Sequence, residues 1–218
     1  MTTKQWLNVD VATRTVKRVG LFSILVGLLP IMAHAQSVYE KGGNIFFKDA
    51  HYQEAQLTAL ERDSEPSLSS NKKLVVFVRT TTKQPISTGN GESAWTELWI
   101  TNIATQQTKR IVDSKASDQM QKVLAGFSSP QFSANAKSVF FLSQAWVTSA
   151  AVHRVDLQTK QVQFVAAGND LVVIRQGQYL GHLQINQHRY HKNGGSYDCD
   201  YIFDTAGKEV KSIQNSCD

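Results

Sequence analysis

The sequence lacks the features that would mark an obvious membrane protein or hydrolase. Its longest apolar run, from Val19 to Met32, covers about 14 residues, whereas a helix needs ~20 to cross a bilayer. There is no Gly-x-Ser-x-Gly nucleophile elbow, because Gly194-Gly195-Ser196 is followed by Tyr197. The glycine pairs are isolated and are typical of turns, not of phosphate-binding loops.

The N-terminal segment, residues 1–35, has the pattern of a secretory signal helix. Basic residues precede the apolar run, Pro30 interrupts it, and the small residues Ala33 and Ala35 follow. We expect cleavage between Ala35 and Gln36, which predicts a periplasmic or secreted domain over residues 36–218 with no stable membrane span. The alternative is a membrane anchor. The absence of a cysteine after the run and of an Arg-Arg pair favours the general secretion route without lipidation.

The positive charge of the chain is concentrated in this segment. The net charge of the whole chain is +5, and residues 1–35 contain four basic residues and one acidic residue, so the rest carries only about +2. No basic stripe remains, and nucleic acid is therefore not an expected partner.

The two cysteines, Cys199 and Cys217, lie close together in the sequence. In an oxidising compartment this spacing favours a disulfide, which would contribute ~3 kcal/mol by closing a short loop. The alternative is two free thiols.

Short apolar runs rich in β-branched and aromatic residues dominate the chain after residue 40, without helical periodicity. Continuous runs predict buried strands at 45–47, 74–78, 139–142 and 171–174. Alternating patterns at 95–102 and 197–204 predict strands with one wetter face.

An internal repeat organises these strands. Residues 66–77 and 130–141 place Pro, Ser, Asn and Lys in register before a strand, and 98–105 resembles 152–159. Further strands follow at 108–112 and 161–165, so each copy predicts four strands. We expect Asn71 and Asn135 to adopt the left-handed conformation of the tight turns. A partial unit (44–48, 56–60) precedes the copies, and a divergent unit (171–213) follows them, with a hairpin turn at 204–208.

Glu97-Leu98-Trp99-Ile100, together with the Ser-x-Asn-x-Lys turns, resembles the TolB-type, WD40-like β-propeller repeat. The family turn is Pro-Asp-Gly-Lys, and both copies here lack its Pro and Gly. The resemblance implies an all-β fold, a small or partial β-propeller of about four antiparallel four-stranded blades, at ~40–45 residues a blade. An open arc of blades would leave sheet edges unpaired, which a homodimer contact could cover.

Histidines and acidic residues gather near the C-terminus: His182, His188, His191, Asp198 and Asp200. Their spacing matches no metal motif, so we expect structural or surface roles, no metal and no cofactor.

Tryptophans are the remaining candidates for a binding site. Trp99 occupies a repeat position, which favours packing between blades, whereas Trp95 and Trp146 flank loops and are candidate partner-binding residues. The loop from Thr80 to Ala94 contains Pro and Gly, and we expect it to be mobile, exposed and the natural contact.

These features favour an exported, non-enzymatic module that docks an envelope protein, with no catalytic residues. The alternative is a divergent enzyme or enzyme-associated propeller that acts on peptides or glycans, with the His182–His191 region as its site.

Overall fold

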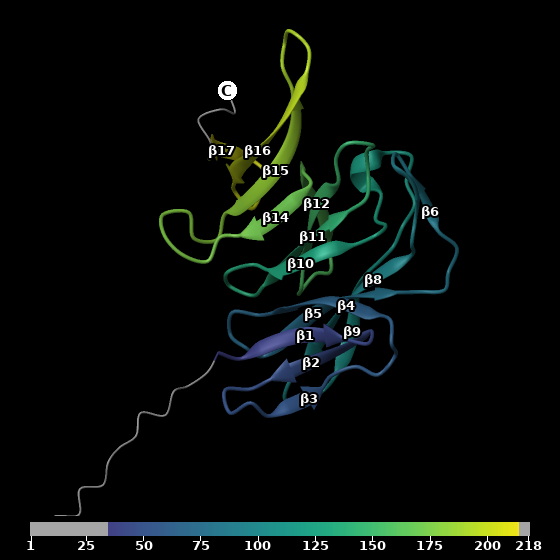
Figure 1. Cartoon of the computed structure of the whole chain (residues 1–218), viewed down its shortest axis with the longest axis vertical. Coiled ribbons are helices and arrows are strands. Elements are labelled where there is room, and N and C mark those ends of the chain that lie inside the picture. Colours follow the sequence, from purple (N-terminus) through teal and green to yellow (C-terminus); the bar gives the residue numbers. More distant parts are fainter. Residues whose placement is uncertain (1–34, 214–218) are drawn as a thin grey trace, which may run out of the picture. The chain divides into compact units, whose positions relative to one another are not determined.

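The computed structural model describes residues 35–213, which form β-sheets joined by turns and one 3-10 turn, without an α-helix among them (Figure 1). The first sheet comprises β1 (Ser37–Lys41), β2 (Asn44–Lys48) and β3 (Glu54–Gln56). The second comprises β4 (Asp63–Leu68), β5 (Leu74–Thr80), β8 (Thr96–Asn102) and β9 (Thr108–Asp113). The third comprises β10 (Ser128–Phe132), β11 (Ser138–Ser143), β12 (Ala151–Asp156) and β13 (Val162–Ala167). The fourth comprises β14 (Asp170–Val173), β15 (Leu183–Tyr190), β16 (Ser196–Phe203) and β17 (Glu209–Ser212). A small hairpin, β6 (Ile86–Thr88) and β7 (Gly91–Ser93), and the 3-10 turn η1 (Met120–Lys122) complete the elements.

Each sheet is an antiparallel meander, with its strands side by side in chain order apart from the inserted β6–β7 hairpin. This confirms the expected all-β fold of repeated four-stranded units, although the first sheet has three strands. The predicted signal helix and Ala33 lie outside the described residues, whereas Ala35 and Gln36 directly precede β1. No helix among residues 35–213 is long and apolar enough to cross a membrane.

The two repeated turns have matching geometry, but the residue in the left-handed conformation is not the one expected. It is Lys72 in one turn (φ +58°) and Ala136 in the other (φ +55°), one position after each Asn. Asn71 and Asn135 instead accept hydrogen bonds through Oδ1 from the backbone N–H groups two residues later. The Asn side chain therefore closes the turn as an Asx motif, and the strained position passes to the next residue.

The hydrophobic core lies between successive sheets. Ile45 and Phe47 of the first sheet pack against Val75 and Phe77 of the second, with Trp99 alongside. Two further clusters join the second sheet to the third and the third to the fourth. Trp99 thus packs between sheets, as its repeat position predicted.

The position of the second sheet, between the first and the third, corrects the expectation of a wetter face for β8. Five of the seven residues of β8 are buried, including the polar Glu97 and Thr101. The buried negative charge of Glu97 is balanced by Arg110, whose Nη1 lies 2.5 Å from the Glu97 carboxylate. The hydroxyl of Thr101 receives a hydrogen bond from Thr108.

The first strands of the sheets carry contacts from one sheet to the next. β4 contacts β1 and β2 on one side and β10 on the other, and β10 contacts β14. Within residues 35–213, no pair of strands joins the first sheet to the fourth by contacts as extensive as these. The outward faces of these two sheets are therefore not covered as the inner faces are.

Candidate functional site

Most residues of the loop from Thr80 to Ala94 are exposed, as its composition predicted, but the loop also contains regular structure and buried residues. It forms the β6–β7 hairpin, and Ile86 is buried against Val123 and Ala125. At the tip, the Gly89 N–H donates a hydrogen bond to the Ala145 carbonyl at 2.6 Å. A Cβ atom at Gly89 would lie 2.5 Å from that carbonyl oxygen, so only glycine permits the contact.

Ionic and aromatic contacts hold the base of the hairpin. The Trp95 indole N–H donates to Asp113 at 2.7 Å, and the Lys83 ammonium lies 4.5 Å from the centre of the indole ring. Arg110 joins Asp113 to the buried Glu97. Trp95 is thus half-buried with its donor occupied, at the base of the hairpin and away from its tip.

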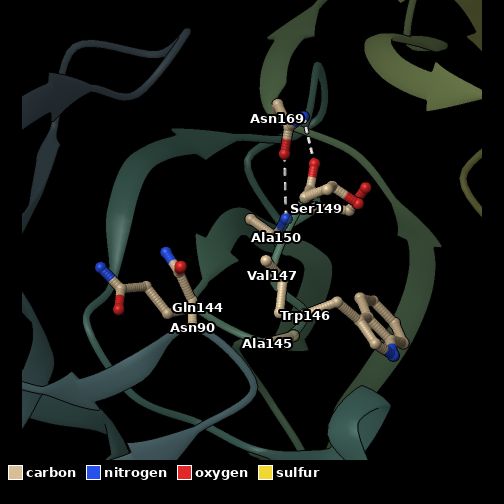
Figure 2. A pocket seen from close by; sticks show the side chains of 9 residues that line it. Asn90, Gln144, Ala145, Trp146, Val147, Ser149, Ala150 and Asn169 are labelled. Carbon is tan, nitrogen blue, oxygen red and sulfur yellow. Dashed lines mark hydrogen bonds between the residues drawn. The ribbon is translucent and has the colours of Figure 1, made fainter. Parts of the chain in front are cut away.

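The tip of the hairpin meets the loop between β11 and β12 in a small cleft of about 180 Å³. Asn90 lines it from the hairpin, and residues 144–150 and Asn169 line the rest (Figure 2). Trp146 is among these residues, so the structure brings together the predicted contact loop and one predicted tryptophan. Hereafter these residues are called the Asn90–Trp146 cleft.

Asn169, in the turn between β13 and β14, fastens the wall of the cleft. Its Oδ1 accepts a hydrogen bond from the Ala150 N–H at 3.0 Å, and its Nδ2 donates to the Thr148 carbonyl at 2.9 Å (Figure 2). The backbone N–H of Trp146 also donates to the Ser149 carbonyl, which forms a tight turn within the loop. One amide side chain therefore satisfies both backbone groups that would otherwise be free to move.

The surface of the cleft combines amides with an exposed apolar side chain. In Figure 2, Asn90 and Gln144 lie on one side, and the indole of Trp146 lies on the opposite side. That indole packs edge-to-face on Phe164 at 6.1 Å between ring centres. Val147 is 72% exposed at the end of the loop. Amide groups and an exposed apolar anchor suit a peptide backbone and side chain better than a charged metabolite.

Comparisons with known proteins give a fold and no closer relationship. No family model and no curated protein matches the sequence. Among solved structures, dipeptidyl peptidase 4 of Porphyromonas gingivalis aligns with a TM-score of 0.57 at 14% identity, over 83% of this chain and 31% of that one. The β-propeller domain of the Trilobed protease from Pyrococcus furiosus aligns at 0.54 and 12%, over 78% and 48%. TolB from Acinetobacter baumannii aligns at 0.53 and 16%, over 83% and 41%.

The chain has a TolB-like β-propeller fold. It spans less than half the length of each of these three structures, and identities this low carry the fold alone. The four sheets are its blades, and the β6–β7 hairpin is an insertion in the second blade that reaches the third.

Each of the C-terminal histidines has a different partner. His188 on β15 pairs with Asp198 on β16 through Nδ1 at 2.9 Å, His191 lies against Tyr197, and His182 lies against Tyr179. Asp200 accepts hydrogen bonds from Gln184 and Asn186. Within the described part of the chain, no three metal-ligating side chains gather as a site.

Sequence reasoning missed a buried serine–histidine pair in the third blade. His153 on β12 lies 3.1 Å through Nδ1 from Ser143 Oγ on β11, and its Nε2 donates to the Gln121 carbonyl at 3.0 Å. Burial lowers the pKa of His153, and the Ser143 hydroxyl also donates to the Val123 carbonyl at 3.1 Å. The one available signal was that His153 lies opposite the apolar Phe141 on the neighbouring strand. The alternation of apolar and polar residues in the sequence does not show which polar side chains are buried.

This pair lacks the geometry of a hydrolase. Ser143 is 1% exposed, so a substrate cannot reach its hydroxyl. The group beyond the imidazole is the backbone carbonyl of Gln121, where a triad places a carboxylate. We conclude that His153 and Ser143 join the third blade to the η1 segment.

Cys199 is buried in β16 within the core between the third and fourth blades. No free cysteine occurs among the described residues. Cys217 lies outside the described residues, so the pairing stays a prediction.

Proposed function

We propose that this protein is an exported, non-enzymatic interaction module that docks an envelope protein through the Asn90–Trp146 cleft. The observation that carries the proposal is the meeting of the inserted hairpin with the β11–β12 loop. The Gly89–Ala145 hydrogen bond joins two blades there and builds a surface that neither blade has alone. Loops at the ends of rigid sheets are where such folds present their binding residues.

The chemistry of this surface favours a peptide segment of a folded partner. Val147 offers an apolar anchor, and Asn90 and Gln144 offer donors and acceptors for a peptide backbone. A cleft of about 180 Å³ accommodates one side chain and not a cofactor, for which pockets are typically several hundred Å³. Trp95 contributes indirectly, because it fixes the base of the hairpin.

Site-specific photocrosslinking tests the docking surface. A photoreactive residue at Val147 in the exported protein, irradiated in intact cells, is expected to give one defined adduct. The matched control is Lys137, which is exposed in a turn of the third blade, outside the cleft and outside the first and fourth blades, and should give none. Adducts of equal yield at both positions, or no adduct at Val147, would refute the proposal.

A variant that loosens the cleft tests whether the partner needs the ordered cleft or only the exposed Val147 side chain. Asn169→Ala removes both hydrogen bonds that hold the loop at Thr148 and Ala150, while Val147 stays exposed. We expect the Val147 adduct to fall at least about fivefold, because each lost bond is worth ~1 kcal/mol. An unchanged yield would mean that the loop alone, and not the cleft, makes the contact.

Export is the second part of the proposal. Cell fractionation followed by N-terminal sequencing should recover a chain that begins at Gln36 in the periplasmic or secreted fraction. A chain that keeps its first 35 residues in the membrane fraction would instead support the anchor.

The alternative, an enzyme acting on peptides or glycans, has one favourable observation. Asp198 orients His188 through Nδ1, which leaves Nε2 for a ligand. A turnover of peptide or glycan substrates that His188→Ala abolishes would establish this alternative and overturn the non-enzymatic proposal.

A further inference from the structure

The outward face of the first blade carries an aromatic pair between basic residues. Ile45 and Phe47 of β2 point into the core, so Phe46 and Lys48 lie on the opposite face. Tyr39 of β1 stacks on Phe46 with the ring centres 5.5 Å apart. Lys41 faces outward in the same register, and Glu54 of β3 pairs with Lys48. Two cations and one anion therefore border an aromatic centre.

The outward face of the fourth blade carries an exposed valine, the polar side chains Gln184 and Asn186 of its second strand, and several carboxylates. Leu171 and Val173 are buried against the third blade, so Asp170 and Val172 face away, and Val172 is 43% exposed. Asp200 and Ile202 of β16 lie on this same face in register with β14 and β15, although Ile202 is only 5% exposed, so Val172 is the apolar residue open to a partner.

Asp198 continues this acidic face towards the tip of the β15–β16 hairpin, where it pairs with His188. Lys211, opposite Ile202, is the basic residue of β17 there. Three carboxylates, one of them paired with His188, therefore lie on this face beside one ammonium.

The two faces complement each other in charge and in the placement of their apolar side chains. Lys41 and Lys48 would meet the carboxylates at Asp170 and Asp200, and the Tyr39–Phe46 pair would cover Val172. Complementary charge sets partner choice and register in an interface, while the apolar centre supplies the stability. Neither face has extensive contacts with the other within one chain.

We propose that the occupant of both faces is a second copy of this chain. The first blade of each copy packs on the fourth blade of the other, so that a two-fold axis relates two identical contacts. Two copies would supply eight blades in all, which is within the range of closed propellers. Closure makes the same contact twice, so a modest face suffices for a stable dimer. This inference is independent of the proposed docking at the Asn90–Trp146 cleft.

The solution mass of the exported protein, measured by sedimentation across micromolar concentrations, tests the dimer. We expect twice the mass of one chain. Two charge-reversed variants test the faces: Lys41→Glu with Lys48→Glu on the first blade, and Asp170→Lys on the fourth. Each alone should weaken dimerisation at least about tenfold, because like charges then oppose each other. Lys137→Glu, in an exposed turn of the third blade, is the matched control and should have no effect.

Mixing the two variants gives the decisive result. In a mixed dimer, one contact joins the new glutamates to the new lysine, and the other contact is unaltered, so an equimolar mixture should regain the dimer. A contact between two first blades would instead leave the Asp170→Lys variant alone fully dimeric. A monomer at every concentration, a dimer indifferent to both variants, or a mixture without recovery would each overturn the proposal. Circular dichroism of every variant confirms that the fold is retained.

Discussion

The carboxylate of Glu65 accepts a hydrogen bond from the backbone N–H of Ser129 at 2.5 Å. The two residues occupy corresponding places in two blades, each just before the proline of its repeat, and both are left-handed, with φ values of +51° and +50°. The register of each first strand shifts at that point, which marks a bulge. The bulges bring the first strands of the second and third blades within reach of each other.

Glu65→Ala should therefore weaken the joint between these blades. We expect the free energy of unfolding to fall by about 1 kcal/mol, because an exposed charged hydrogen bond is lost. Glu65→Gln keeps an acceptor oxygen and should lose less. Urea unfolding of the three proteins measures this difference, and no loss for Glu65→Ala would show that the bond contributes nothing.

Ala136→Gly should stabilise the protein, although this change usually destabilises a strand or helix. Ala136 has φ +55°, where a Cβ costs ~1 kcal/mol that glycine avoids. Part of the gain is offset by the entropy of the unfolded chain, so the expected increase is ~0.5 kcal/mol. Ala55→Gly in β3, a matched control in ordinary extended backbone, should lower the melting temperature instead.

Ser93→Ala should be neutral or stabilising by about 1 kcal/mol. The Ser93 hydroxyl is buried, and it is the one buried side-chain polar atom without a partner among the described residues. Removing such a group avoids its desolvation cost. Ser114→Ala is the contrasting variant, because the Ser114 hydroxyl donates to the Thr96 carbonyl at 2.7 Å and accepts from the Thr96 N–H. Thermal unfolding should rank Ser93→Ala above Ser114→Ala, and the reverse order would contradict the assignment.

Gly89→Ala should release the inserted hairpin from the third blade. The new Cβ would lie 2.5 Å from the Ala145 carbonyl oxygen, so the tip must move. Hydrogen exchange at residues 86–93 should accelerate while the blade cores stay protected. The matched control is Gly91→Ala, where a Cβ meets open space and only the backbone angle is strained. Equal exchange in both variants would mean that the tip is not held by this contact.

Acid should destabilise the protein through His153. Burial lowers the pKa of this imidazole below its ordinary value of 6.5, so the unfolded chain binds a proton more readily than the folded one. The stabilisation is complete above pH 6.5 and is lost as the pH falls below it. Each pH unit below that point costs at most about 1.4 kcal/mol. Urea midpoints at pH 7.5 and pH 5.0 should differ less for His153→Gln than for the unaltered protein, and an equal difference would exclude His153.

The strands were predictable because their apolar patterns are local. The runs at 74–78, 139–142 and 161–165 became β5, β11 and β13 almost as expected. In the first blade, the sequence did not predict β1. The strand expected at 56–60 ends at Gln56, because the Leu57 N–H donates to the Ile45 carbonyl as a single hydrogen bond outside the strand pairing. Periodicity cannot register such single long-range bonds.

The candidate cleft could be predicted only in part. Trp146 and the loop from Thr80 were singled out separately, but their meeting depends on Gly89 and Ala145, which lie far apart in sequence. The hairpin was expected to be mobile because proline and glycine are common in loops. Ile86 of the hairpin is nevertheless buried against Val123 and Ala125, a contact that composition does not show.

Asn169 gives the wall of the cleft a property that matters for any ligand. Because its amide already fixes Thr148 and Ala150 in the unliganded protein, the wall has little conformational freedom left to lose on association. Preorganisation of this kind raises affinity by lowering the entropic cost of binding. A partner bound here should therefore associate without a slow rearrangement step, and variants that loosen the wall should shorten its residence time more than they alter its rate of arrival.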